Sequence, residues 1–177
     1  MVLLSFLPAA FGRYAELTLA FAARDLRIRY RQTLLGVLWV MAQPLGFVML
    51  MAPIFRNLLS PVAPPFYPLF VLSGLVPWFF LANSLSVATT SLTGNATLLT
   101  KVRFPRTSLP VACVLSFGLD LGIGWTLWFA LAVVSGIPLT AGVLWMIPLT
   151  LLQALFVTGL AVGCAVGNAR NGEAGAA

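Results

Sequence analysis

Few residues in this sequence could do chemistry, and the most distinctive is an acidic group inside a long apolar run. Asp120 lies within FGLDLGIGW, where a membrane-spanning helix would place it at depth. An ionised side chain is costly there, so it faces protein or water rather than lipid. Asp120 could therefore make a polar contact between helices, line a polar conduit or relay protons. A relay would need a second acid or a histidine beside it, and the chain has 0 histidines.

Motifs for nucleotide binding and catalysis are absent from the sequence. It contains no GxxxxGK[ST] loop, and its single lysine, Lys101, stands between Thr100 and Val102. It also has no Ser/His/Asp set, no metal-ligand cluster and no pair of carboxylates within one apolar run. Cys113 and Cys164 lie in hydrophobic runs without CxxC spacing, which is typical of small packing residues. The sequence therefore predicts a protein that is no enzyme, binds no metal and holds no cofactor of its own.

Aromatic side chains are the third group with possible chemistry. Rings that lined a pore could stack on the faces of sugars, and Trp39, Phe47 and Trp78 are the candidates. Aromatic residues in membrane helices also pack against lipid or other helices, or gather in interfacial belts. The sequence leaves both interpretations open.

The elements that must position these residues are membrane-spanning helices. Hydrophobic residues make up 60% of the chain, charged residues 8%, and the mean hydropathy is +1.02, whereas a soluble domain has about 25% charged residues. The run from Leu34 to Phe55 has no charged residue. As a helix it would be roughly 33 Å long, enough to cross a hydrocarbon core of about 30 Å. We expect one all-α membrane domain over residues 33–166.

Three further hydrophobic runs predict three more spans. Pro44 in the first span and Pro77 in the second are expected to bend their helices, which neighbouring helices can accommodate in a membrane. The four spans are expected at about residues 34–55, 66–89, 108–135 and 143–166.

The segments between and after the spans are polar or rich in turn-forming residues. Residues 90–107 predict a loop, with a turn at Gly94 and Asn95, and Gly136 to Pro138 predicts a tight turn. Residues 167–177 are small and polar without periodicity, so we expect a disordered tail.

Residues 1–32 have a different character from the spans. Over residues 12–31, at about 100° per residue, most charged side chains fall on one side, and Leu19 and Ala22 fall opposite. Asp25 and Arg29 lie off the charged side. The pattern predicts an amphipathic helix on the membrane surface, or a docking surface for a cytoplasmic partner. The charged side consists of Arg13, Glu16, Arg24, Arg27 and Arg31.

The basic residues are distributed unequally between the two ends of the spans. Five arginines precede the first span and three basic residues lie in residues 90–107, while the opposite connections hold Arg56 alone. The positive-inside rule then places both termini in the cytoplasm. Lipid headgroups account for the net charge of +6 more simply than a nucleic acid does, so we expect no nucleic-acid partner.

Two stretches carry motifs that are recognisable as a pair. Residues 24–45 read RDLRIRYRQTLLGVLWVMAQPL, and residues 70–112 contain G-x-x-P-W at Gly74 to Trp78 and K-V-x-F-P-R at Lys101 to Arg106. Together they resemble the ABC-2 type permeases that export O-antigen, capsule or teichoic acid across bacterial inner membranes. Asp120 also stands where such permeases often have a polar residue in the third span. The likeness covers about residues 13–125.

The resemblance implies a transmembrane subunit that forms a homodimer and pairs with a separate ABC ATPase. ATP hydrolysis in that partner would move a lipid-linked glycan through the membrane. The basic helix would frame the cytoplasmic entrance, where arginines could contact the pyrophosphate of the lipid carrier. The implied ATPase-coupling residues are Asn95, Leu98, Leu99, Lys101, Phe104, Pro105 and Arg106, and the implied entrance residues are Arg24, Asp25, Arg27, Tyr30 and Arg31.

The sequence departs from this family at its C-terminal end. Family members usually have six spans, whereas four are expected here, so the resemblance implies the first four spans of a truncated permease. Two alternatives stay open: a four-helix membrane scaffold that does not transport, and an ABC-2 permease for a drug or a small lipid. No feature of the sequence identifies the glycan.

Overall fold

The computed structural model describes residues 3–31, 37–59, 66–94, 105 and 107–174, and the regular structure in these ranges is helical. The prediction of an all-α protein is therefore confirmed. The elements are α1 (Leu3–Arg31), α2 (Val37–Leu59), α3 (Tyr67–Gly94), α5 (Ser108–Val134), the short 3-10 helix η1 (Ala141–Trp145) and α6 (Met146–Ala174).

Four helical segments in the described ranges are long and apolar enough to cross a membrane, which confirms the predicted number of spans. Each is at least 18 residues long, and at about 1.5 Å per residue the longer ones exceed the hydrocarbon thickness of about 30 Å. The cytoplasmic position of both termini stays a prediction. The segments are Leu38–Phe55, Tyr67–Gly94, Ser108–Val134 and Ala141–Ala169.

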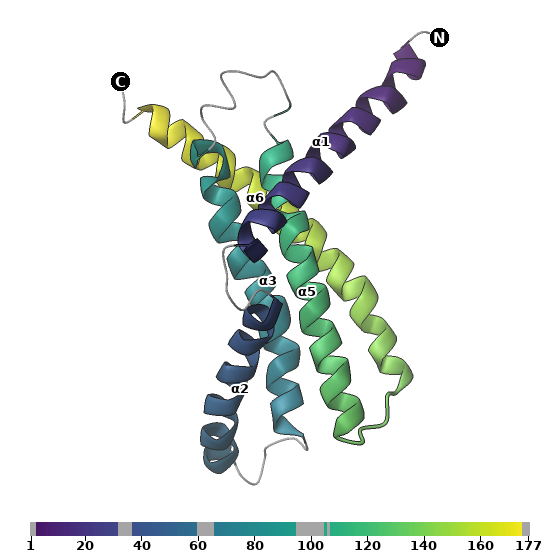
Figure 1. The fold of residues 1–177 in the computed structure, drawn as a ribbon, viewed down its shortest axis with the longest axis vertical. Helices are drawn as coiled ribbons and strands as arrows, with labels where there is room; N and C mark the ends of the chain where they lie inside the picture. Colours follow the sequence, from purple (N-terminus) through teal and green to yellow (C-terminus); the bar gives the residue numbers. More distant parts are fainter. Residues whose placement is uncertain (1–2, 32–36, 60–65, 95–104, 106, 175–177) are drawn as a thin grey trace.

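Three long helices, α3, α5 and α6, form the centre of the bundle, and α3 contacts both of the others (Figure 1). Helix α2 lies against α3 and α5 near one end of the bundle. Helix α1 crosses α5, and its N-terminal part projects away from the bundle (Figure 1). The shared core is built from apolar side chains that include Leu72, Phe80, Phe117, Leu121 and Val157.

A close contact between α3 and α5 depends on a glycine. A Cβ atom added at Gly124 would lie 2.8 Å from Cγ1 of Val76, which is a side chain buried in the core. Small residues let helix backbones approach closely in membranes, where packing rather than the hydrophobic effect drives helix association. Gly124 therefore sets the spacing of the two helices beside the site described below.

Side-chain amides and an indole tie the helices together through backbone carbonyls. Gln153 Nε2 on α6 donates to the carbonyl of Pro77 at 2.8 Å, and Trp128 Nε1 on α5 donates to the carbonyl of Leu69 at 3.1 Å. Near the other end of α6, Asn168 Nδ2 donates to the carbonyl of Thr89 at 3.0 Å. These bonds fix the register of α3 against α5 and α6.

The predicted ends of the second and fourth spans are wrong, because both helices continue through polar residues that form hydrogen bonds with backbone carbonyls of the helices. Helix α3 continues through residues 90–94, which were predicted as loop, since hydroxyl groups there bond back to carbonyls of their own helix, as Ser91 Oγ does to Ala88 at 2.7 Å. Residues 167–174 are helical rather than disordered. The bond of Asn168 to α3 holds this part of α6 in place.

The remaining boundaries differ by smaller amounts. Helix α1 begins at Leu3 instead of residue 12, because the apolar stretch before Gly12 continues the helix. The predicted turn after the third span is confirmed, and Gly136 adopts a positive φ of 68°, a conformation that favours glycine. The fourth span begins with η1 at Ala141 and continues into α6. Residues 32–36, around the predicted join of the first helix and first span, lie outside the described ranges.

Candidate functional site

Asp120 on α5 forms an ion pair with Arg29, which lies in the last turn of α1. Arg29 Nη1 donates to Asp120 Oδ2 at 2.8 Å, and the two side chains are 27% and 16% exposed. The pair joins residues that are 91 positions apart in the chain. A carboxylate inside a membrane bundle requires such a partner, because its charge loses most of its hydration there.

The Arg29 guanidinium makes further contacts along α5. Its Nη2 donates to Ser116 Oγ at 3.1 Å, and its Cζ lies 3.6 Å from the centroid of the Phe117 ring. Ser116 in turn donates to the carbonyl of Cys113 at 2.8 Å. A planar guanidinium suits this arrangement, since it can donate several hydrogen bonds while stacking on an aromatic face.

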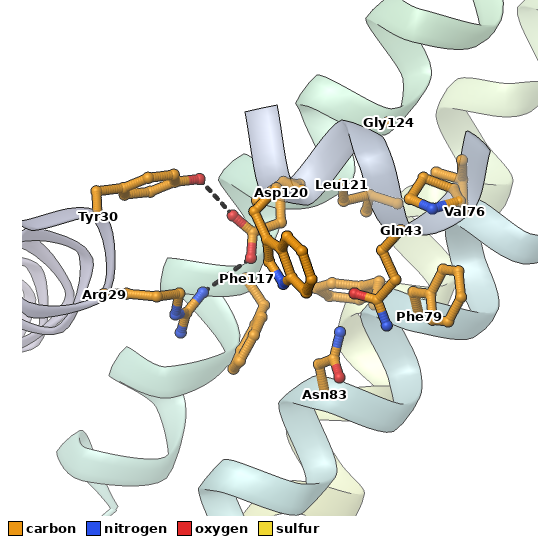
Figure 2. Close-up of a pocket in the computed structure, with 14 residues that line it drawn as sticks. Arg29, Tyr30, Gln43, Val76, Phe79, Asn83, Phe117, Asp120, Leu121 and Gly124 are labelled. Atoms are coloured by element: carbon orange, nitrogen blue, oxygen red, sulfur yellow. Dashed lines mark hydrogen bonds and ion pairs between the residues drawn. The ribbon is translucent and has the colours of Figure 1, made fainter. Parts of the chain in front are cut away.

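Tyr30 contacts the second oxygen of the same carboxylate. Its hydroxyl donates to Asp120 Oδ1 at 2.5 Å, so consecutive residues of α1 occupy both oxygens of Asp120 (Figure 2). Burial, the hydrogen bond to Asp120 and the negative charge of that carboxylate raise the pKa of Tyr30 from 10.0 to about 12. Tyr30 is therefore a neutral hydrogen-bond donor at physiological pH.

A pocket of about 440 Å³ opens beside this cluster, within the range of about 300–1,000 Å³ typical of ligand sites. Its walls come from α1, α2, α3 and α5, so it lies where the basic helix meets three of the spans. Its lining residues are Arg29, Tyr30, Trp39, Val40, Gln43, Pro44, Val76, Phe79, Phe80, Asn83, Phe117, Asp120, Leu121 and Gly124.

The lining combines carboxamides with aromatic rings. The amide groups of Gln43 from α2 and Asn83 from α3 converge in the pocket, with the Phe79 ring beside them (Figure 2). Carboxamides both donate and accept hydrogen bonds, and aromatic rings offer flat apolar faces. This is a surface that can bind a ligand with many hydroxyl groups.

Known proteins are similar to this sequence over much of its length. It is 32% identical over 152 residues to an O-antigen export system permease protein, RfbA, of Klebsiella pneumoniae, and the match covers 85% of this chain. A second RfbA of Klebsiella pneumoniae matches at 32% identity over 152 residues. The RfbA of Myxococcus xanthus is 32% identical over 108 residues, covering 59% of this chain and 40% of that protein. No family model matches the chain.

The chain is a relative of the O-antigen export permeases. With its four apolar spans it is a multi-pass protein of the bacterial inner membrane. It spans 58% of the length of the Klebsiella pneumoniae permeases that it matches.

The predicted entrance residues divide between two sides of α1. Tyr30 contacts Asp120, and Asp25 lies toward α5, where Cys113 Sγ is 3.8 Å from its Oδ2. The arginines lie on the other side, although Arg24 also bonds Asp25 at 3.1 Å. A shallow groove of about 350 Å³ runs along that side, lined by Ala20, Ala23, Arg24, Arg27, Ile28 and Arg31.

The predicted stacking residues also divide. Trp39 lines the pocket, whereas Phe47 and Trp78 do not contribute to it. All three side chains are exposed, at 56% for Trp39, 44% for Phe47 and 60% for Trp78. Phe79, the neighbour of Trp78, supplies the aromatic wall from α3 instead. Consecutive helix residues point about 100° apart, so the motif that contains Trp78 places the adjacent ring in the pocket.

The predicted ATPase-coupling residues fall mostly on a segment that the structure does not describe. Pro105 is described: it is exposed, and its carbonyl accepts hydrogen bonds from the Ser108 backbone N–H at 3.0 Å and from Ser108 Oγ at 2.7 Å. Pro105 therefore helps to begin α5. The residues outside the described ranges are Asn95, Leu98, Leu99, Lys101, Phe104 and Arg106.

Sequence reasoning missed Arg29, Gln43 and Asn83. A signal for Arg29 existed, because Arg29 and Asp25 are four residues apart and share a side of α1 away from the other charges. A lone carboxylate in the third span needed a cation, and an arginine off the charged side was available. Gln43 and Asn83 gave no comparable signal, since uncharged amides occur in spans for many reasons.

Proposed function

We propose that the chain is a transmembrane permease subunit of an ATP-driven exporter that moves a lipid-linked glycan across the inner membrane. The observation that carries the proposal is the pocket between α1, α2, α3 and α5, whose lining combines carboxamides with aromatic rings. The name of the Klebsiella pneumoniae relatives, O-antigen export permease, supports a glycan as the cargo.

ATP hydrolysis is assigned to a separate ABC ATPase subunit, so the chain itself is a transport subunit and no enzyme. The sequence supports this division because it contains no P-loop. We assign the contact with the ATPase to residues 95–106, which follow the long helix α3 and lead into α5. The chain is further proposed to act as a homodimer, as the family resemblance implies.

The groove along α1 is assigned to anionic headgroups. Arg27 and Arg31 are exposed and stand four residues apart, one turn of helix, with Arg24 beside them. Guanidinium groups bind phosphate oxygens through pairs of hydrogen bonds, so this face suits the pyrophosphate of a lipid carrier or the phosphates of membrane lipids. The opposite face of α1 is held by α5 through Arg29.

The test is capture of the ATPase subunit of the Klebsiella pneumoniae O-antigen export system by this chain in detergent. We expect the chain to retain the ATPase, and a variant with residues 93–102 replaced by a Gly/Ser linker of equal length to lose it. The matched control replaces residues 60–65, which are predicted on the opposite side of the membrane, and should retain the ATPase. If no variant captures more ATPase than an unrelated four-span protein, the exporter assignment is wrong and a scaffold role is favoured.

A further inference from the structure

We propose that the pocket selects uncharged sugar units and that Gln43 and Asn83 are its specificity-determining residues. The inference rests on the proposed function, because it takes the pocket to lie on the path of the glycan. It adds the charge class of the cargo and the side chains that would recognise it.

The charges of the pocket balance each other. Among its lining residues, all of which are described, Arg29 and Asp120 are the ionised pair, and they contact each other at 2.8 Å. Both oxygens of Asp120 accept hydrogen bonds, one from Arg29 and one from Tyr30. The Arg29 guanidinium also bonds Ser116 and stacks on Phe117. The two charges therefore compensate each other within the pocket.

A ligand with a charge of its own would enter this pocket without a counter-ion. Charges interact strongly and are poorly solvated in a low-dielectric site, so an unpaired carboxylate or phosphate is disfavoured there. An acidic sugar that drew Arg29 away from Asp120 would leave that carboxylate unpaired instead. The balanced pair thus acts against acidic sugars.

The uncharged polar groups fit hydroxyl groups. Gln43 and Asn83 reach the pocket from different helices, α2 and α3, and their amide groups converge (Figure 2). Each carboxamide can donate and accept at once, as can each sugar hydroxyl, so one sugar ring can bridge the two side chains. The rings of Trp39 and Phe79 supply apolar faces for the C–H side of the same sugar.

Saturation-transfer NMR on the purified chain in nanodiscs tests the selectivity, with maltotriose as the neutral probe and trigalacturonate as the acidic probe. We expect maltotriose to bind and trigalacturonate to give no signal. Asn83→Ala and Gln43→Ala should each weaken maltotriose binding by roughly threefold to tenfold, the effect of one lost neutral hydrogen bond. Asn168→Ala is the matched control, because it removes a carboxamide that bonds α3 outside the pocket, and it should leave binding unchanged.

Changing the charge of the pocket gives a second test, in which the expected result is a gain of binding to the acidic probe. Asp120→Asn leaves Arg29 unbalanced, so trigalacturonate should now bind, at least about tenfold more tightly than to the original chain. The double variant Arg29→Gln with Asp120→Asn is uncharged in the pocket and should again reject the acidic probe. If Asp120→Asn folds and still excludes trigalacturonate, charge balance is not the cause of selectivity.

Equal binding of both probes to the original chain would overturn the inference, and so would binding that neither carboxamide affects. ATPase capture is measured on the same preparations to separate this outcome from the proposed function. If the chain captures the ATPase but binds neither probe, the pocket assignment fails while the exporter assignment stands. If maltotriose binds as expected and the ATPase is not captured, the exporter assignment fails instead.

Discussion

Arg29 and Asp120 meet at 2.8 Å although they are 91 positions apart in the chain. Arg29 lies in the last turn of α1, the helix that precedes the spans, and Asp120 lies midway along α5, the third span. Because Tyr30 binds the other oxygen of Asp120, the end of α1 is attached to this carboxylate through two side chains. Both attachments also line the pocket, so a movement of α1 would change the pocket wall directly.

The pair between Arg29 and Asp120 should contribute measurably to stability. Removing one partner leaves the other charge poorly solvated, and we expect Arg29→Gln or Asp120→Asn to lower the free energy of unfolding by roughly 1.5–3 kcal/mol. The double variant should lose less than the sum of the two single variants. Unfolding in mixed micelles, monitored by circular dichroism, provides the four free energies of the cycle.

The neighbouring pair of Arg24 and Asp25 is the matched control for this cycle. These two side chains are 3.1 Å apart but more exposed, at 39% and 23%. Solvent screens such a pair, so Arg24→Gln and Asp25→Asn should each cost less than about 1 kcal/mol. Equal effects for the two pairs would contradict the special role assigned to Arg29 and Asp120.

Stability should depend on the ionisation of Tyr30 at alkaline pH. Its pKa is about 12 in the folded chain, above the ordinary value of 10.0, so the folded state favours the neutral phenol. The stabilising contribution of Tyr30 is then complete below pH 10 and is lost as the pH rises toward 12. Thermal unfolding from pH 8 to 12 measures it: the difference between the original chain and Tyr30→Phe should be constant at first and then shrink. A difference that stays constant over this range would show that the hydroxyl is not held by Asp120.

A methyl group added at Gly124 should destabilise the packing of α3 against α5, whereas one added at Gly118 should not. Gly124→Ala places a methyl group 2.8 Å from the stiff, β-branched Val76, and overpacking of this kind costs about 1–3 kcal/mol. Val76→Ala in the same chain should restore most of the loss. Gly118→Ala is the matched control, since a Cβ there meets nothing within 4 Å and alanine favours helix. If both glycine variants unfold at the same denaturant concentration, the close approach is not a constraint.

The number and type of the helices could be predicted from the sequence because each span is a continuous apolar run. Boundaries failed where the chain is polar, since helix α3 continues through residues 90–94 by bonding hydroxyl groups to its own carbonyls. The predicted end of α6 was wrong for a different reason. Asn168 donates a hydrogen bond to a carbonyl of α3, which is distant in sequence. The local sequence pattern shows which side chains are polar, but it does not show which backbone carbonyl will accept a hydrogen bond from each of them.

The site was partly predictable for the same physical reason. Asp120 could be singled out because a charge in an apolar run is costly, and Trp39 because its ring type suits sugars. The pocket itself depends on how α1, α2, α3 and α5 pack, and helical periodicity leaves that arrangement undetermined. Phe79 lines the pocket and Trp78 does not, because consecutive side chains of a helix point in different directions.

The groove on the outer side of α1 should retain anionic lipid. Replacing Arg24, Arg27 and Arg31 by Gln should reduce the phosphatidylglycerol that stays bound in native mass spectrometry, since each basic residue near a membrane surface contributes about 1 kcal/mol. The matched control replaces three arginines from elsewhere in the sequence and should retain more lipid. Its substitutions are Arg13→Gln, Arg56→Gln and Arg170→Gln. Equal lipid loss in the two triple variants would show that the groove does not bind the lipid.

Photo-crosslinking to the cargo tests whether a glycan passes through the pocket. A benzophenone amino acid is placed at Trp39, which lines the pocket, or at Trp145, which is 69% exposed in η1 and outside it. Both variants are expressed in Klebsiella pneumoniae cells that make O-antigen, and adducts are detected with an antibody against the glycan after irradiation. We predict a glycan adduct at position 39 and none at position 145. No adduct at position 39, or equal adducts at both positions, would contradict a glycan path through this pocket.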